Sequence, residues 1–174
     1  VMESMLNKKI NISICGHGIM GKNHERVCRK RGIEVSNIYD PVTSEISYEK
    51  FLKNVKYSDG VIISSPTSSH KKNLEDILSY NKNIKVLLEK PCFENSDYNN
   101  SSIINSKNIL VGQVERFNPV VEKIKNLLEG QRIFQIRTKR VSNVSAREKI
   151  DCRKDIGIHD LDFCSFILNK RTNK

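Results

Sequence analysis

The chain has 174 residues, of which 37% are hydrophobic and 29% are charged, and its formal net charge is +10. This balance is typical of a soluble globular protein and excludes an intrinsically disordered chain. No apolar run is long enough to cross a membrane, and the first ten residues lack the apolar core of a secretory signal. We therefore expect no membrane partner, and a length that allows one complete domain and part of a second.

The cysteines and the basic residues narrow the class of protein further. Five cysteines are scattered along the chain without a CxxC pair, which predicts reduced thiols in a cytoplasmic protein. Basic residues are enriched only in 132–154, a stretch without the interleaved aromatic residues on which nucleobases stack. The positive charge therefore favours a phosphate-bearing small molecule, or simple solubility, over a nucleic-acid partner.

Short apolar runs alternate with helical patterns over the first two thirds of the chain. The runs predict strands at 10–15, 33–40, 59–65, 84–90 and 108–113. The segments between them predict helices at 19–31, around 48–54, at 69–80 and, more weakly, within 94–106. This order predicts the α/β class, with a Rossmann-type, doubly wound parallel sheet covered by helices on both faces.

Two of these helices have a predicted core face. In the helix at 19–31, Ile19, Val27 and Cys28 are expected to share the buried side, and Gly32 is expected to end the helix. In the helix at 69–80, the buried side is expected to carry Leu74, Ile77 and Leu78.

The pattern changes from Asn118 onward. Asn118 and Pro119 predict the capped start of a helix that ends before Gly130. Residues 132–141 predict one long strand, and residues 155–168 predict a further helix. Because one strand and two helices do not form a self-sufficient layer, we predict a dinucleotide-binding domain at 1–113 and a partial α/β substrate domain with an open sheet at 114–174.

The stretch "CGHGIMG" is a G-x-G-x-x-G turn that follows a strand and opens a helix. The first glycine permits the tight turn, the second lets the backbone approach a pyrophosphate, and the third lets the helix pack closely on the strand. The helix N-terminus then faces the phosphates. The predicted phosphate-binding residues are Gly16, Gly18, Ile19, Met20 and Gly21.

An acid follows the second predicted strand, nineteen residues after the last of these glycines. The carboxylate of Asp40 could accept a hydrogen bond from a ribose 2′-hydroxyl and would repel a 2′-phosphate, so the sequence favours NAD over NADP. The alternative is an ordinary glycine turn followed by an unrelated turn aspartate.

A lysine stands at the carboxyl end of the fourth predicted strand, where parallel sheets bind their ligands. Pro91 holds Lys90 in an extended conformation, and an ammonium group there could stabilise a developing alkoxide. The alternative is a solvated pair of Glu89 and Lys90 at the edge of the sheet.

A histidine and two acids share one face of the last predicted helix. Asp155, His159 and Asp162 lie at positions i, i+4 and i+7. An acid one turn from a histidine can orient the imidazole for proton transfer. The alternative is an exposed polar stripe, and a zinc site is disfavoured because no cysteine or second histidine lies at ligand spacing.

Four stretches together resemble the Gfo/Idh/MocA oxidoreductase family, namely "GHGIMGKNH", "SSPTSSH", "EKP" and "DIGIHDLD". Its members have an N-terminal Rossmann domain and a C-terminal α/β domain whose open sheet often forms a dimer interface. The resemblance implies that Lys90, Asp155 and His159 serve the reaction, and it implies a homo-oligomer where that sheet is complete. The positions that it implies along the dinucleotide are Ser65, Pro66, Thr67, His70, Glu89 and Lys90.

The stretch "VGQVERFNP", residues 111–119, is similar to a motif of the branch that acts on UDP-linked amino sugars, such as UDP-N-acetylglucosamine 3-dehydrogenases. That branch often has His or Tyr where Gln113 stands. The candidate substrate-binding residues are Arg116, Asn118 and Asp162.

These patterns predict an NAD-dependent oxidoreductase that transfers a hydride between a sugar or nucleotide-sugar hydroxyl and a nicotinamide. His159 would take the hydroxyl proton, Lys90 would stabilise the alkoxide, and Asp155 would orient His159. Family members continue for a further sheet-rich stretch beyond the last helix predicted here. The alternative is therefore a non-catalytic dinucleotide-binding or sensor module from a truncated family member.

Overall fold

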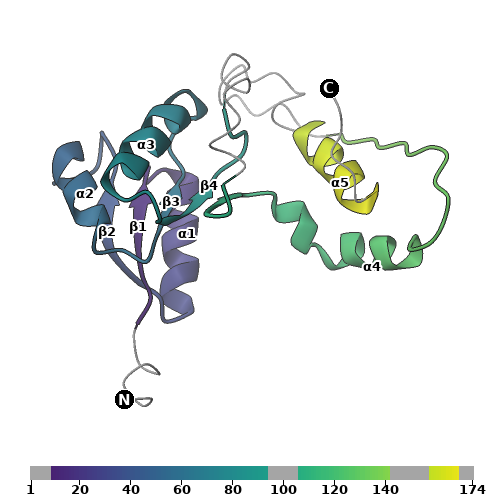
Figure 1. Cartoon of the computed structure of the whole chain (residues 1–174), viewed down its shortest axis with the longest axis horizontal. Helices are drawn as coiled ribbons and strands as arrows, with labels where there is room; N and C mark the ends of the chain where they lie inside the picture. The colour runs from purple at the N-terminus through teal and green to yellow at the C-terminus, as the bar shows by residue number, and fades with distance from the viewer. Residues whose placement is uncertain (1–8, 94–105, 142–156, 169–174) are drawn as a thin grey trace. The chain divides into compact units, whose positions relative to one another are not determined.

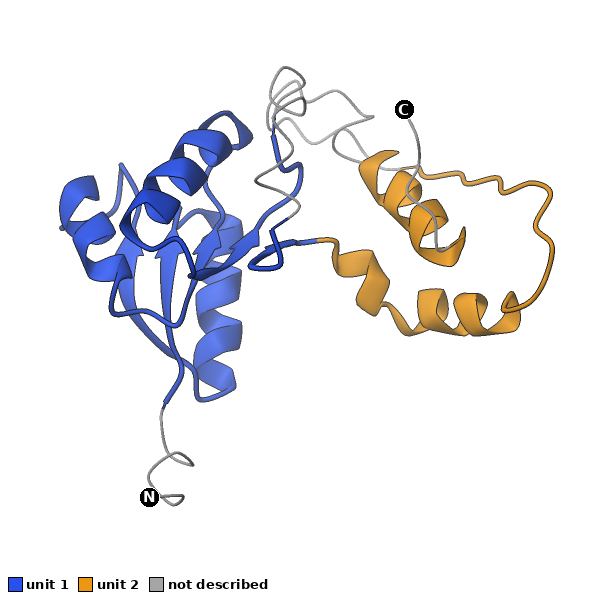
Figure 2. Cartoon of the chain, in the orientation of Figure 1, with its two compact units in different colours: residues 1–112 blue, residues 113–174 orange. Residues whose placement is uncertain are grey.

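The computed structural model of the chain describes residues 9–93, 106–141 and 157–168. The chain divides into two compact units, residues 1–112 and residues 113–174 (Figure 2). The predicted helix within 94–106 falls almost wholly outside the described residues.

The first unit is built on a sheet of five parallel strands in the order β2-β1-β3-β4-β5. The strands are β1 (Asn11–Cys15), β2 (Glu34–Tyr39), β3 (Gly60–Ile63), β4 (Lys85–Leu88) and β5 (Ile109–Val111). Each lies within one of the apolar runs of the sequence. The strand order reverses between β1 and β3, which is the point where open parallel sheets bind ligands beyond their carboxyl ends. The predicted α/β class and parallel sheet are confirmed.

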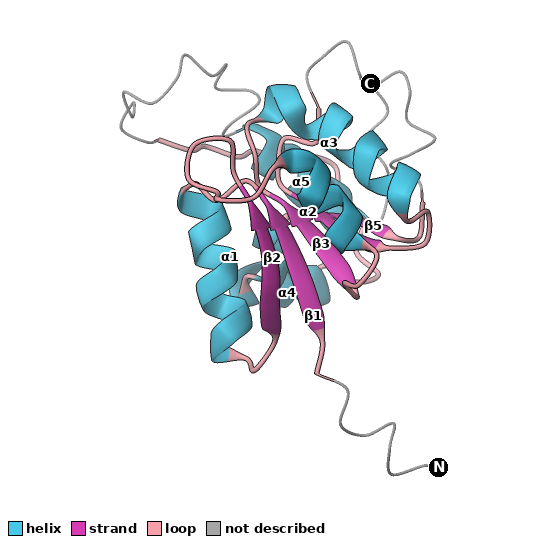
Figure 3. Ribbon diagram, turned by 90° about the vertical axis from the view of Figure 1, so that its left-hand side faces the viewer, coloured by secondary structure: helices cyan, strands magenta, loops and turns pink. Residues whose placement is uncertain are grey.

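Three helices cover the two faces of this sheet (Figures 1 and 3). Helix α1 (Ile19–Lys30) lies on one face, and helices α2 (Tyr48–Val55) and α3 (Thr67–Tyr80) lie on the other. Helix α2 is only eight residues long and contains the whole of the range 48–54 predicted for it. Ser47 begins it by accepting a hydrogen bond from the backbone N–H of Lys50 at 3.2 Å.

The core consists of one apolar layer on each face of the sheet. Alternate residues of a strand point to opposite faces, so Cys15 and Ile63 join the α2–α3 layer while Ile14 and Ile62 join the α1 layer. Burial on both faces explains why β3, whose four residues are all buried, reads as a continuous apolar run. In α3, Leu74 and Ile77 are fully buried, as predicted.

The predicted buried side of α1 is wrong for two of its three residues. Ile19 and Val27 are 58% and 47% exposed, whereas Gly21 and Cys28 are buried. The helix rests against the sheet at Gly21, because the missing side chain permits the closest approach there. The buried side therefore passes through Gly21 and Cys28, and hydrophobicity alone did not identify it.

The second unit contains a short 3-10 helix, η3 (Val114–Phe117), followed by α4 (Pro119–Leu127) and α5 (Ile158–Leu168). The side chain of Asn118 accepts a hydrogen bond from the backbone N–H of Val120 at 3.0 Å, and Pro119 occupies the first helical position. The predicted start of α4 is confirmed. Val121 is buried on this helix, and α5 buries Asp162 and Ile167.

The predicted strand at 132–141 is wrong, because these residues are neither strand nor helix. A strand needs a neighbour to receive its backbone N–H and C=O groups, and no strand pairs with this segment in the described part of the chain. Phe134 and Val141 are each 84% exposed.

Candidate functional site

The glycine turn between β1 and α1 is fixed by close backbone packing. Gly16 has a φ of +95°, and its N–H donates to the carbonyl of Tyr39 at 2.7 Å. A Cβ atom at Gly16 would lie 2.3 Å from the backbone nitrogen of Ser65, and one at Gly21 would lie 2.1 Å from the carbonyl oxygen of Gly16. Neither position can hold a side chain without moving the backbone.

Gly18 differs, because a Cβ atom there would meet nothing within 4 Å. It immediately precedes α1, and the next two residues, Ile19 and Met20, are exposed. The first N–H groups of α1 therefore adjoin an open surface at the carboxyl edge of the sheet. These residues fit the pyrophosphate of a dinucleotide, since backbone N–H groups and the helix dipole both attract anions.

Asp40 is attached to the glycine turn. One carboxylate oxygen accepts the backbone N–H of His17 at 2.8 Å, and the other accepts those of Val42 and Thr43 at 3.0 and 3.3 Å. Partial burial by itself would raise the pKa of Asp40, but these hydrogen bonds outweigh it and the pKa is lowered. The group therefore remains a carboxylate, and its other lone pairs can accept a ribose hydroxyl.

A pocket of about 250 Å³ adjoins the glycine turn. Its lining includes Gly16, Ser65 and Pro66, so the structure brings together residues that the sequence placed in separate motifs. Tyr39 and Tyr48 also line it, with ring centroids 4.9 Å apart. Sequence reasoning missed both tyrosines, although Tyr39 directly precedes Asp40.

Lys90 stands in the turn that follows β4, between a buried acid and a cis-proline peptide bond. Glu89 is 7% exposed, and its carboxylate lies 2.7 Å from Nε2 of His24 on α1. A Cβ atom at Gly112 would lie 3.3 Å from that carboxylate, so a side chain there would require Glu89 to shift by a few tenths of an ångström. The alternative of a solvated Glu89 at the sheet edge is therefore wrong.

His70 lies beneath the surface, on α3, and is 1% exposed. Its Nε2 lies 2.8 Å from the carbonyl oxygen of Ser65, and its Nδ1 lies 3.0 Å and 3.1 Å from the carbonyl oxygens of Pro91 and Cys92. The ring thus lies between the loop after β3 and the turn after β4, with carbonyl oxygens facing both of its nitrogens. Thr67, another residue expected along the dinucleotide, is the first residue of α3.

Two candidate substrate residues of the second unit bind each other. Nε of Arg116 donates to both carboxylate oxygens of Asp162, at 3.1 and 2.8 Å, and Nη2 also donates to this carboxylate. The hydrogen bonds to Asp162 raise the pKa of Arg116. The third candidate, Asn118, caps α4.

His159 lies on α5 beside a network of charged side chains. Arg140 donates to Asp160 at 2.7 Å and to Glu115 at 3.1 Å. The hydrogen bond from Arg140, followed by that from Asn118, lowers the pKa of Glu115. Asp155 lies outside the described residues, so its contact with His159 stays a prediction. Glu115 and Arg140 were missed because their pairing joins residues far apart in the sequence.

No protein-family model and no curated protein matches the sequence. Solved structures do match the fold. An NAD-binding protein from Listeria innocua aligns at 23% identity and a TM-score of 0.71, over 92% of this chain and 55% of that one. A UDP-N-acetylglucosamine 3-dehydrogenase from Acidithiobacillus ferrooxidans aligns at 18% identity and a TM-score of 0.73, over 92% and 57%.

A third match is an oxidoreductase from Agrobacterium radiobacter in complex with NAD+, L-tartaric acid and magnesium, at 18% identity and a TM-score of 0.66, over 92% and 55%. The chain has the fold of NAD-binding oxidoreductases. The resemblance to the Gfo/Idh/MocA type is thus confirmed for the fold. The chain spans a little over half of the length of each of these three structures.

The pairing of Arg116 with Asp162 leads to a prediction for the second unit. In Arg116→Met, Asp162 would remain buried without its partner, at a cost of about 1–3 kcal/mol. We expect native-state hydrogen exchange of the α5 amides to accelerate by about ten-fold or more. The double variant Arg116→Met with Asp162→Asn should recover most of the protection. Unchanged exchange in Arg116→Met would show that the pair does not stabilise this unit.

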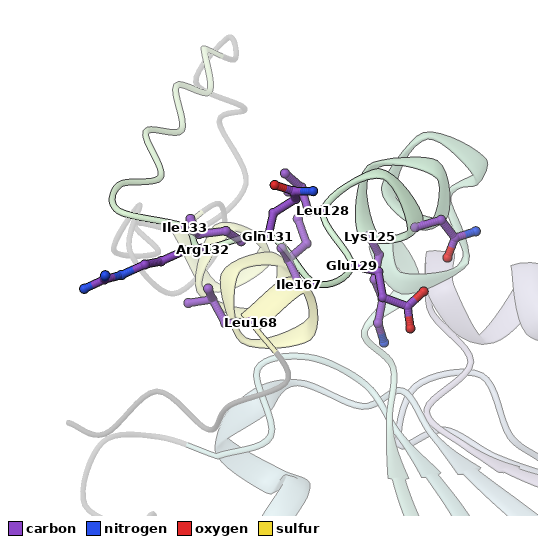
Figure 4. Close-up of a pocket in the computed structure, with 10 residues that line it drawn as sticks. Lys125, Leu128, Glu129, Gln131, Arg132, Ile133, Ile167 and Leu168 are labelled. Atoms are coloured by element: carbon purple, nitrogen blue, oxygen red, sulfur yellow. The ribbon is translucent and has the colours of Figure 1, made fainter.

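A second pocket, of about 610 Å³, lies within the second unit (Figure 4). It is lined by residues near the end of α4, by the segment that follows, and by Ile167 and Leu168 at the end of α5. None of the site residues predicted from the sequence lines it.

The described residues contain neither a metal-binding cluster nor a helix that could span a membrane. In 9–93, 106–141 and 157–168, no group of three or more His, Cys, Asp and Glu side chains could hold a metal ion. None of the helices in these ranges is long and apolar enough to span a membrane.

Proposed function

We propose that this chain is an NAD-dependent oxidoreductase that transfers a hydride between a sugar or nucleotide-sugar hydroxyl and a nicotinamide. The observation that carries the proposal is the glycine turn, with Asp40 hydrogen-bonded to its backbone, at the carboxyl edge of the sheet. In this fold, that edge is where a dinucleotide binds.

The first unit supplies the residues that hold the dinucleotide. The backbone around Gly18 and the start of α1 receive the pyrophosphate, and Asp40 accepts the ribose hydroxyl. The pocket beside Tyr39 and Pro66 receives the adenosine end. When bound, NAD supplies the acceptor for the hydride.

Three side chains act on the substrate hydroxyl. The Lys90 ammonium hydrogen-bonds its oxygen and stabilises the negative charge that develops there. His159 accepts the proton, and Asp155 orients the imidazole. Because Arg116 and Asp162 bind each other in this structure, we assign them to support of α5 and not to the first contact with substrate.

Three observations support a nucleotide-sugar substrate. One matching structure is a UDP-N-acetylglucosamine 3-dehydrogenase, and residues 111–119 are similar to a motif of that branch. The net charge of +10 suits a substrate that carries phosphates. We further propose a cytoplasmic protein that forms a homo-oligomer where the full C-terminal sheet is present.

The proposal is tested in two steps, binding and turnover. Calorimetric titration with NAD should show a single site, and NADH absorbance should rise with at least one member of a panel of UDP-sugars, free sugars and inositols. Binding of NAD without turnover on any of them would favour a non-catalytic dinucleotide-binding module. Absence of NAD binding would overturn the proposal.

The choice between NAD and NADP is tested at Asp40. We expect Asp40→Asn to lower the affinity for NAD about ten-fold, because a hydrogen bond to a charged acceptor is lost. The affinity for NADP should fall less, because the repulsion of its 2′-phosphate is removed at the same time. A matched control is Asp59→Asn, since Asp59 also accepts a backbone N–H, from Asn11 at 2.9 Å, but at the amino end of the strands. An equal loss of affinity for NAD and for NADP would contradict the proposed role of Asp40 in selecting NAD.

A further inference from the structure

The turn that carries Lys90 is bonded to a histidine on its N-terminal side. Glu89 directly precedes Lys90, and its buried carboxylate lies 2.7 Å from Nε2 of His24. His24 projects from α1, on one face of the sheet. A carboxylate that is 7% exposed is costly without such a partner, so His24 holds Glu89 in place.

A second histidine is bonded to the turn on its C-terminal side. Nδ1 of His70 faces the carbonyl oxygens of Pro91 and Cys92, at 3.0 and 3.1 Å. Nε2 of the same ring faces the carbonyl oxygen of Ser65, at 2.8 Å. His70 projects from α3, on the opposite face of the sheet from α1. The backbone on both sides of Lys90 is therefore bonded to side chains from both helical layers.

Among the described residues, the main-chain bonds of the sheet reach the turn as far as Glu89. The N–H of Glu89 donates to the carbonyl of Ile63 at 2.9 Å, and the N–H of Gly112 donates to that of Leu88 at 2.8 Å. Beyond this point, the carbonyl oxygens of Pro91 and Cys92 face Nδ1 of His70. A packed hydrocarbon side chain could fill the same volume, but it could not set the position of these carbonyls.

We propose that His24 and His70 are positioning residues that fix the Lys90 turn from its two sides. Glu89 transmits the effect of His24, and the carbonyls of Pro91 and Cys92 transmit that of His70. The role of Lys90 itself rests on the function proposed above. The two histidines do not contact the substrate in this proposal, so His70 supports the dinucleotide site from beneath and does not line it.

The chemistry of the two rings allows variants that keep or remove single bonds. Glutamine places an amide near the position of Nε2, and asparagine places one near that of Nδ1. His24→Gln therefore keeps the bond to Glu89, while His24→Ala removes it. His70→Asn keeps the bonds to Pro91 and Cys92, while His70→Gln keeps only the bond to Ser65.

The measurement is the rate at which the Cys92 thiol is modified under native conditions, resolved by peptide mass spectrometry. Cys92 is 7% exposed, and burial raises the pKa of its thiol to about 11, so modification requires the turn to open. We expect His24→Ala and His70→Gln to accelerate it about ten-fold, and His24→Gln and His70→Asn to accelerate it less than about three-fold.

Glu25→Ala is the matched control. Glu25 lies on the same helix as His24, and its carboxylate is also 2.7 Å from an imidazole, that of His17. Breaking this second pair should leave the modification of Cys92 unchanged. If His70→Gln fails to fold because its ring is buried, the partly exposed His24 and its two variants still decide the outcome.

The thiol measurement requires no substrate, so it separates this proposal from the proposed function. Unchanged modification of Cys92 in His24→Ala would overturn the positioning role, whether or not the wild type shows turnover. In an active protein, His24→Ala should also lower kcat about ten-fold without changing the Kd for NAD. Faster modification with unchanged kcat would equally overturn it, because Lys90 would then not need the turn to be fixed. Faster modification in a wild-type protein without turnover would support the fixed turn and count against the proposed function alone.

Discussion

Replacing Gly16 with alanine is expected to destabilise the first unit and to abolish dinucleotide binding. Its φ of +95° is unfavourable for any residue with a side chain, and the added Cβ would lie 2.3 Å from the backbone of Ser65. The clash is with main-chain atoms, so it cannot be relieved by a rotamer change. We therefore expect the free energy of unfolding to fall by about 3 kcal/mol. Gly21→Ala should behave similarly, because its Cβ would meet the carbonyl of Gly16.

Gly18→Ala is the matched control for this experiment. Its φ is −71°, and nothing lies within 4 Å of the added Cβ. The free energy of unfolding, measured in urea, should therefore change by less than about 0.5 kcal/mol. Affinity for NAD, measured by calorimetry, should nevertheless fall, because the methyl group occupies the space that we assign to the pyrophosphate. Retained NAD affinity in Gly18→Ala, or normal stability in Gly16→Ala, would contradict this account of the turn.

The second large effect is expected from Lys90→Met. Methionine keeps much of the side-chain volume but removes the ammonium group, so the proposed stabilisation of the alkoxide is lost. The loss of one such donor lowers kcat by about 10²–10³-fold in enzymes that use it. The glycine turn and Asp40 are untouched, so the Kd for NAD should change by less than about three-fold.

Lys85→Met provides the comparison for Lys90→Met. Lys85 begins the same strand, β4, at its amino end, where it is exposed and bonded to Asn108. The same change of charge at this end should leave kcat unaltered. A similar kcat in both variants would show that Lys90 has no part in the chemistry. A parallel loss of NAD affinity and kcat in Lys90→Met would instead assign it to cofactor binding.

The sequence by itself was sufficient for the elements whose signals are local. Short runs rich in apolar residues marked the five strands, most clearly β3, whose four residues are all buried. Asn118 and Pro119 marked the start of α4, because capping depends on neighbouring residues only. The glycine turn could be predicted in the same way, because the spacing of its glycines reflects the backbone conformation of a few consecutive residues.

Only the tertiary structure decided which polar groups meet and which surfaces are covered. The pairs His24–Glu89 and Arg116–Asp162 join residues that are 65 and 46 positions apart. No local sequence pattern indicates either pairing. The buried side of α1 depends on Gly21 fitting against the sheet, and residues 132–141 lack a neighbouring strand in the described structure despite their apolar content. Local patterns reflect backbone propensity, whereas these pairings and contacts depend on where the strand order brings distant residues together.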